Sequence, residues 1–504
     1  MSNLNFQLSF KEQANIIDKE RNEMKVLEYK NESDELTCPK CGEKINLNSE
    51  KINDIKSFIK NIDDTIQGAK LIIEKIIKMC RIDIVNIQLK TVNFIFNTLN
   101  EDIKKLNIKF DDLLNVKDIK KGINFNNYII AEIDIKDEDI YKNIKILSSF
   151  EESLKTNPGK FLNDNIFKNE DEIKKCEIKI NNEIIPFSYY RQFKSKGKYI
   201  IKYSFKNNLK CTCLMFGDCK LLTNINLSNF NTNNVINMNG MFYGCSSLTN
   251  INLSKFNTNN VINMNAMFYG CSSLNQIDLS NFNTNNVTNT GFMFSHCTSL
   301  TNINLSNFNT NNVINMNGMF YGCSSLININ LSNFNTNKVT NMGCMFLGCS
   351  LLNKIDISNF NTYNVTDMGG MFYGCSSLKD INLSSFNTYN VTDMGGMFRD
   401  CSSLKDINLS NFNTKNVTDM CCMFSGCSSL NKIDLSSFNT NKITNMNGMF
   451  YGCSSLKYIN LSNYNANNVT DMDYMFGDCP YLNKNNIIIK DKRIFDNETL
   501  FQKV

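Results

Sequence analysis

Apolar and polar positions follow one another in the same order every 26 residues over the second half of the chain. In the first unit, from Leu222 to Phe230, leucine, isoleucine and phenylalanine alternate with threonine, asparagine and serine, which predicts a short strand with one apolar face. An Asn-Thr turn follows. Valine, methionine and phenylalanine then recur at spacings of three, three and one up to Phe242, which suits a 3₁₀ or short helical return.

The unit is present ten times, and a fixed period of this length indicates a solenoid. One unit cannot bury both its strand face and its Met-Phe face, whereas stacked neighbours bury both, so we expect a core that runs lengthwise down the array. The Met-Phe pair is followed by a cysteine three residues later in eleven places: Cys219, Cys245, Cys271, Cys297, Cys323, Cys349, Cys375, Cys401, Cys427, Cys453 and Cys479.

Equivalent residues should form ladders, because parallel strands of successive coils lie about 4.8 Å apart. Asn231 and its equivalents can form amide hydrogen bonds along the axis. The ladder cysteines should come close enough for disulfides, yet equivalent side chains point the same way, which favours buried free thiols. We interpret the extra cysteines Cys344, Cys421 and Cys422 as drift at positions where other units carry Asn, Ala or Gly.

The unit resembles the 26-residue repeat of BspA-like leucine-rich-repeat surface proteins, whose pattern is L-x-x-I-D-L-S-x-F-D-T-S-x-V-T-x-M-x-x-M-F-x-x-C-x-x-L. The resemblance covers residues 214–482. It implies a leucine-rich-repeat-like stack with a parallel sheet and, in bacterial members, an exported protein that adheres to host or matrix components. The residues before Lys25 contain no run of seven apolar residues, so we expect no secretory signal and favour the cytoplasm. The cell surface is the alternative that the resemblance implies.

The later units carry most of the variable and charged side chains. Residues 221–350 contain three Asp, Glu, Lys or Arg, against nineteen in 351–482. In leucine-rich repeats the strands line a concave face, which makes variable strand positions candidates for ligand binding. We therefore expect a protein partner to contact Lys354, Asp380, Asp406, Lys432 and Tyr458 in the strands, with Tyr363 and Tyr389 nearby. Recent duplication of the first five units would produce the same asymmetry.

Residues 1–48 contain half of a zinc site, because Cys38 and Cys41 lie on one CPxCG knuckle. No second pair of ligands lies nearby in sequence. Two copies in a dimer could complete a four-cysteine site, and a metal-free relic is the alternative. Residues 49–122 keep apolar positions at alternating spacings of three and four, which predicts a coiled coil or helical hairpin. We expect this stripe to form a homo-oligomer, although it could instead pack within its own chain.

Residues 126–210 change to strand-like runs, which predict a small β-rich domain that caps the first coil. The predicted strands are joined by a hairpin turn at Asn181-Asn182 and by an exposed loop over Leu154–Lys168. Residues 483–504 read as a C-terminal cap. The predicted strands are Tyr128–Ile135, Ile144–Leu147, Cys176–Ile180, Glu183–Phe187 and Lys198–Phe205. The fold class expected for the whole chain is an α+β solenoid.

Composition and charge narrow the function. The net charge of +4 on 504 residues is too small to indicate nucleic-acid binding, and no apolar stretch is long enough to span a membrane. A single histidine and the lack of phosphate-binding or nucleophile motifs argue against an enzyme. We expect a protein-binding scaffold, with an exported adhesin or a self-assembling structural protein as alternatives.

Overall fold

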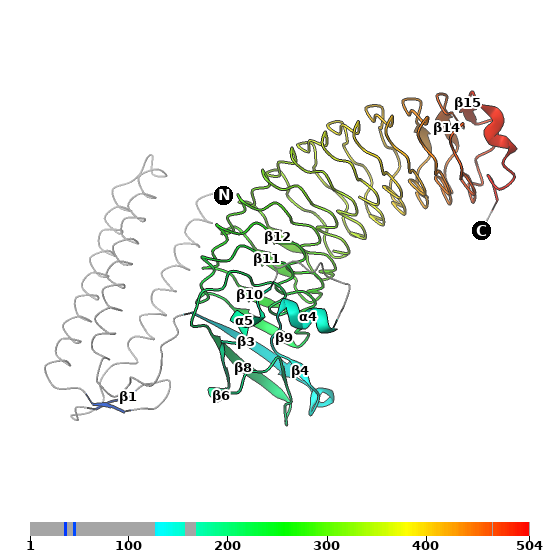
Figure 1. Cartoon of the computed structure of the whole chain (residues 1–504). Helices are drawn as coiled ribbons and strands as arrows, with labels where there is room; N and C mark the ends of the chain where they lie inside the picture. The colour runs from blue at the N-terminus through cyan, green and yellow to red at the C-terminus, as the bar shows by residue number, and fades with distance from the viewer. Residues whose placement is uncertain (1–34, 38–43, 47–126, 157–167, 466, 503–504) are drawn as a thin grey trace, which may run out of the picture. The chain divides into compact units, whose positions relative to one another are not determined.

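The computed structural model describes residues 35–37, 44–46, 127–156, 168–465 and 467–502 (Figure 1). The chain divides into two compact units, Met1–Ile123 and Asn124–Val504. In the first unit, strands β1 (Glu35–Thr37) and β2 (Lys44–Asn46) pair antiparallel. Cys38, Cys41 and the coiled coil predicted over residues 49–122 lie outside the described residues.

The second unit begins with a small β-rich segment. Its strands and helices are β3 (Tyr128–Ile135), η1 (Asp137–Asp139), β4 (Ile144–Lys145), α4 (Phe150–Thr156), α5 (Glu170–Ile173), β5 (Glu177–Ile180), β6 (Glu183–Ile185), β7 (Tyr190–Arg191) and β8 (Gly197–Ser204). Every second residue of β3 is buried, as the apolar alternation of its sequence predicts. Strand β3 pairs antiparallel with β8 on one side and, on the other, with β9 (Leu222–Asn226), the strand of the first coil.

The strand predictions for this segment are confirmed in position, although three of the five strands are shorter than predicted and β8 is shifted by one residue. The hairpin at Asn181 and Asn182 is also confirmed, because both residues have positive φ (47° and 72°) and join β5 to β6. The loop predicted over Leu154–Lys168 starts too early, because helix α4 continues to Thr156.

The repeats form a β-solenoid of about ten turns, which Figure 1 shows as a row of coils. Its strands are β9, β10 (Asn250–Asn252), β11 (Gln276–Asp278), β12 (Asn302–Asn304), β13 (Lys432–Asp434), β14 (Tyr458–Leu461) and β15 (Ile487–Ile489), and η3 (Lys492–Asp496) follows them. Equivalent strands pair in parallel and in register, for example Ile225 with Ile251. A second seam of parallel bridges joins every coil, from Cys211–Asn237 to Asn445–Asp471.

The prediction of a helical return in each repeat is wrong. The predicted α+β class is therefore also wrong for the described residues, because their α-helices are α4 and α5, which precede the repeats. In the first coil, the N–H groups of Met241 and Tyr243 bond three residues back, but those of Gly240 and Phe242 bond carbonyls of the next coil. A helix cannot propagate when every second N–H is used between coils. The return is therefore a series of turns.

Two residues in each return have left-handed backbone. In the first coil they are Gly240 (φ 57°) and Gly244 (φ 69°), where glycine avoids the cost of a Cβ. The same conformation persists where other residues stand, as at Cys422 (φ 54°). The bonding between coils thus fixes the backbone regardless of the side chain.

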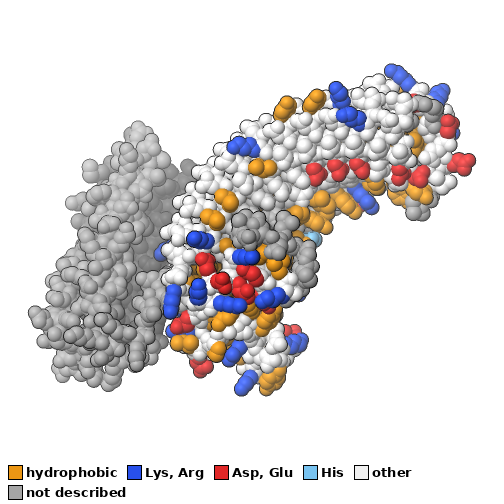
Figure 2. All heavy atoms as spheres, in the orientation of Figure 1, with side chains coloured by type: hydrophobic (Ala, Val, Ile, Leu, Met, Phe, Trp, Pro, Cys, Tyr) orange, Lys and Arg blue, Asp and Glu red, His pale blue; other side chains and the backbone are white. Residues whose placement is uncertain are grey.

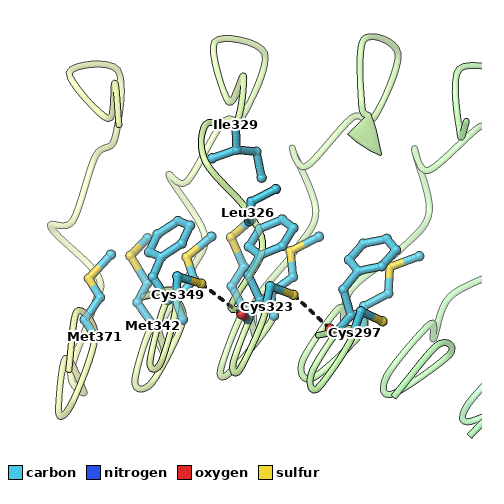
Figure 3. Packing of buried hydrophobic residues seen from close by; sticks show 14 of the residues in the cluster. Cys297, Cys323, Leu326, Ile329, Met342, Cys349 and Met371 are labelled. Atoms are coloured by element: carbon cyan, nitrogen blue, oxygen red, sulfur yellow. Dashed lines mark hydrogen bonds between the residues drawn. The ribbon is translucent and has the colours of Figure 1, made fainter. Parts of the chain in front are cut away.

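The core consists of ladders of identical side chains. Phenylalanine rings such as Phe320 and Phe346 stack with centroids 5.7 Å apart. The ladder cysteines are free and buried, as predicted. Each thiol from Cys245 to Cys479 donates a hydrogen bond to the carbonyl of a ladder phenylalanine in the preceding coil; Cys323 bonds Phe294 at 3.1 Å (Figure 3). The thiols therefore link the coils as well as filling space.

The strand side of the solenoid opens in the middle of the array. The described residues contain no strand between Asn304 and Lys432. On this side the Phe386 and Phe412 rings lie 6.5 Å apart, whereas on the return side Phe398 and Phe424 of the same two coils lie 5.6 Å apart. The coils thus fan apart on the strand side, and the expectation that the strands line a concave face is wrong for these coils.

Asn231 and its equivalents do have amides that bond along the axis, but these amides do not bond one another. The amide of Asn257 donates to Oδ1 of Asn233 in the preceding coil, 2.6 Å away, and that of Asn361 donates to Oδ1 of Asn337, 2.7 Å away. The accepting residues, Asn233 and Asn337, each lie two positions after an Asn231-type asparagine of the same coil. Their backbone N–H groups donate to that asparagine, Asn231 or Asn335. The ladder is therefore diagonal, and in most coils it ties the turn to the one before it.

Candidate binding surface on the later coils

The predicted strand residues form one exposed row, here called the strand strip: Lys354, Asp380, Asp406, Lys432 and Tyr458. Each side chain is exposed because the following isoleucine is turned into the core. Lys432 and Tyr458 are register partners in β13 and β14, so their side chains are neighbours on the same face. The first three members lie in the coils that fan apart.

Tyr363 and Tyr389 form a second row, the tyrosine strip, on neighbouring coils. Their exposed fractions are 53% and 43%. The buried Phe360 and the turn at Ser358-Asn359 separate Tyr363 from Lys354 in the same coil. The predicted residues therefore make two strips on different parts of each coil, and the structure does not merge them into one patch.

Hydrogen bonds hold the backbone of the tyrosine strip on both sides. The N–H of Tyr363 donates to Oδ1 of Asn361 (3.0 Å), and its carbonyl accepts from the amide of Asn390 in the next coil (2.6 Å). Tyr389 is held in the same way by Asn387 and Asn416. Both rings consequently project from a fixed backbone.

The tyrosines take the place of an asparagine that stabilises other coils. Asn337 accepts the amide of Asn361 at this position, and Asn441 accepts that of Asn465. At the tyrosine strip the acceptor is missing, and among the described residues the amides of Asn387 and Asn413 form no equivalent bond. These coils give up a bond between neighbours and expose an aromatic ring instead.

The predicted site did not include a row of carboxylates, here called the aspartate row, on the return side of the coils, where the seam of parallel bridges runs. The aspartate row consists of Asp367, Asp393 and Asp419, which are joined by parallel backbone bridges. Figure 2 shows acidic side chains in a line along the later coils. The sequence signal was available, since three consecutive units replace Asn by Asp at one repeat position.

Asp393, the middle carboxylate of the aspartate row, has the surroundings least favourable to its negative charge. Asp367 and Asp419 each accept a side-chain amide, from Asn341 and Asn445, at 3.1 Å. Asp393 accepts the N–H of Gly395 at 2.8 Å and lies between the two other carboxylates. Burial raises the pKa of Asp393, and the charges of its two neighbours raise it further, while the Gly395 N–H opposes the shift.

We expect Asp393→Asn to stabilise the protein at neutral pH by about 0.5 kcal/mol, the scale of like-charge pairs on adjacent strands. Because the pKa of Asp393 is raised on folding, the wild type loses stability as the pH rises through that pKa, and the variant avoids this loss. Near pH 3 the wild-type carboxyl is protonated, so the gain in stability should vanish there. Thermal unfolding at both pH values measures this. Asp471→Asn is the matched control, because Asp471 accepts the amide of Asn447. A gain that persists at pH 3 would contradict the electrostatic explanation.

Within the described residues, no group of three or more His, Cys, Asp or Glu side chains is arranged to hold a metal ion. Neither is there, in that part of the chain, a helix with the length and apolar character needed to cross a bilayer. The zinc half-site at Cys38 and Cys41 remains a prediction.

The family model described as "Mycoplasma protein of unknown function, DUF285" matches the chain three times, at residues 212–327, 300–406 and 377–491. Together these matches span residues 212–491, more than half of the 504 residues. No curated protein sequence matches the chain. The overlapping matches follow the repeats, in agreement with the coils of the structure.

Proposed function

The chain belongs to the DUF285 family of Mycoplasma-type repeat proteins of unknown function, and on that premise we propose that it is a non-enzymatic scaffold that binds a protein partner on its later coils. The observation that carries the proposal is the substitution of asparagine by Tyr363 and Tyr389. A local rule of the repeat is broken there at a cost in stability, which is typical of functional positions.

The chemistry of the two strips supports a protein as the partner. Exposed tyrosines held on a fixed backbone contribute contact area at a low entropic cost and are frequent at interface hot spots. The strand strip adds positive lysines and negative aspartates. This mixture of charges favours a partner with a mixed charge pattern over a polyanion. Solenoids provide extended surfaces of this kind.

The remaining features of the proposal concern the ends of the chain. The helices predicted over residues 49–122 and the predicted Cys38–Cys41 half-site would join copies into an oligomer and so multiply the binding surfaces. The β-rich segment before the repeats would cap the first coil, a role supported by the pairing of β3 with β9. At the other end β15 would do the same for β14.

An exported adhesin is the second candidate, and the resemblance to the leucine-rich-repeat surface proteins favours it. The two candidates share the same strips and differ in location. Biotinylation of intact cells distinguishes them, since surface labelling of the protein supports the adhesin and excludes the internal scaffold.

The double variant Tyr363→Asn/Tyr389→Asn in the full-length protein tests the strips. We expect it to raise stability by about 1 kcal/mol for two regained hydrogen bonds, because asparagine is the native residue at this position in most coils. At the same time it should lose the partners that the wild type captures from cells of its source. Thermal unfolding and quantitative capture measure the two effects.

The control is Asn285→Ala/Asn311→Ala, which removes the same kind of acceptor in early coils. It should lower stability while capture of the partner is unchanged. Capture that survives the double tyrosine variant would rule out the tyrosine strip as the binding surface.

A further inference from the structure

Cys421 and Cys422 bring two thiols together on the surface of one coil. They occupy the consecutive positions that are Asn239 and Gly240 in the first coil. Adjacent residues of an extended strand point to opposite faces, but the left-handed backbone of Cys422 (φ 54°) turns its side chain toward that of Cys421. The two Sγ atoms lie 3.5 Å apart.

This pair differs from the ladder thiols in its surroundings. Cys421 and Cys422 are half-buried, whereas all eleven ladder cysteines are buried. The neighbouring position in the next coil is Gly448, where a Cβ would lie 3.3 Å from Sγ of Cys422. The preceding coil has Gly395 and Gly396 at the equivalent positions. Cys422 thus has a glycine beside it in both neighbouring coils and Cys421 has one in the preceding coil, and both thiols remain partly exposed to a reagent.

We propose that Cys421 and Cys422 are a redox-active dithiol, which low-molecular-weight disulfides oxidise reversibly to a disulfide between the adjacent residues. The interpretation of these cysteines as drift is thereby replaced. A metal site fits less well, since the described residues supply no third ligand.

The reaction is a two-step thiol–disulfide exchange with a small disulfide RSSR. The thiolate of Cys422 attacks one sulfur of RSSR, forms a mixed disulfide and releases RS⁻, which takes up a proton. Deprotonated Cys421 then attacks the Cys422 sulfur of the mixed disulfide and releases the second RS⁻. The protein loses two protons and two electrons, and RSSR is reduced to two RSH. We assign the first attack to Cys422 because Cys421 is the donor in the hydrogen bond between the two thiols (3.5 Å) and so holds its proton there. Burial, followed by the hydrogen bond and charge of Cys422, also raises the pKa of Cys421.

Geometry makes the disulfide easy to reduce. Cα atoms joined by a trans peptide are about 3.8 Å apart, which is shorter than the roughly 4.4–6.8 Å that unstrained disulfides span. The ring closed by the new bond is therefore strained, and strained disulfides are the labile ones. A thiol reductant should restore the dithiol.

The peptide group inside that ring also joins three coils. Its carbonyl, on Cys421, accepts the N–H of Gly396 in the preceding coil (2.7 Å). Its N–H, on Cys422, donates to the carbonyl of Asn447 in the next coil (2.8 Å). Closure of the ring twists this peptide, so oxidation weakens the hydrogen bonds of one coil to both neighbours.

Peptide mapping of the full-length protein tests the proposal. The native protein is treated with oxidised glutathione, free thiols are blocked with N-ethylmaleimide after unfolding, and peptic peptides are analysed by mass spectrometry. We expect the peptide with Cys421 and Cys422 to lose two hydrogens and to remain unblocked, and dithiothreitol to reverse both changes. Ladder thiols such as Cys323 should be blocked in full. Cys421→Ser should instead keep glutathione on Cys422.

Two results would overturn the proposal. One is maleimide on both cysteines after oxidation, and the other is glutathione retained stably by either wild-type thiol. Hydrogen exchange supplies a separate readout of the coupling between coils. The amides of Gly396 and Cys422 should exchange faster after oxidation, while that of Gly318 should not change, and equal rates in both forms would contradict the link to the neighbouring coils.

Discussion

Raising the pH above 9 should unfold the solenoid, with a midpoint of about pH 10. Burial raises the pKa of all eleven ladder thiols above the ordinary value of 9.0, for example to about 12 for Cys219, Cys349, Cys427 and Cys479. Between pH 9 and 12 the unfolded chain releases these protons and the folded chain keeps them.

The sign and size of the effect follow from proton binding. A pKa that is raised on folding gives stability that is complete below the unfolded value and is lost as pH increases. Each thiol changes the free energy of unfolding by about 1.4 kcal/mol per pH unit, so eleven give roughly 15 kcal/mol per unit, which equals the whole stability of many domains. Circular dichroism across pH 8–11 measures the transition.

Cys323→Ala is the matched variant for this experiment. It should be less stable than the wild type at pH 8, because it loses a buried side chain and the hydrogen bond to Phe294. Its stability should nevertheless fall with pH less steeply, by about 1.4 kcal/mol per unit. An unchanged slope would mean that Cys323 is not the titrating group, and stability that is flat to pH 10.5 would refute the prediction altogether.

Removal of one complete coil should leave a folded and shorter array. Deletion of residues 300–325 joins Ser299 to Leu326, so every ladder continues with the next equivalent residue. Phe294 would then stack on Phe346 as it now stacks on Phe320. Because each coil contacts only its neighbours, the loss should be one coil's share of the stability.

Removal of half a coil should have the opposite result. Deletion of residues 300–312 takes away the strand and the buried Leu305 and Phe308 but keeps the return. The strand-side core on both sides then faces a gap, and we expect loss of cooperative unfolding and aggregation. Urea unfolding and light scattering compare the two deletions. Equal damage from both would show that the coils do not stack as independent layers.

The period of the sequence was sufficient to predict the coils, the parallel strands and the free thiols. Stacking of identical units follows from the repeat itself and needs no knowledge of tertiary contacts. The orientation argument for Cys297 and its equivalents also succeeded, since their thiols bond carbonyls and do not pair.

Features that depend on competition between contacts could not be predicted in the same way. The spacing of Met238 and Met241 fits a helical return, but bonds between coils take the N–H groups that a helix would need. The fan of the coils near Phe386 depends on small differences in spacing that leave no pattern in the sequence. The strand and tyrosine strips are exposed as expected, yet their separation depends on the turn at Ser358-Asn359.

The continuous seam of bridges from Cys211 to Asp471 has a mechanical consequence. A seam of backbone hydrogen bonds resists extension along its own edge, whereas the strand edge lacks paired strands between Asn304 and Lys432. Force applied along the array should therefore bend these coils before it stretches them, with the seam as the neutral axis. Compliance would be concentrated in the segment that carries Tyr363, Tyr389 and the dithiol, so tension and ligand capture would act on the same few coils.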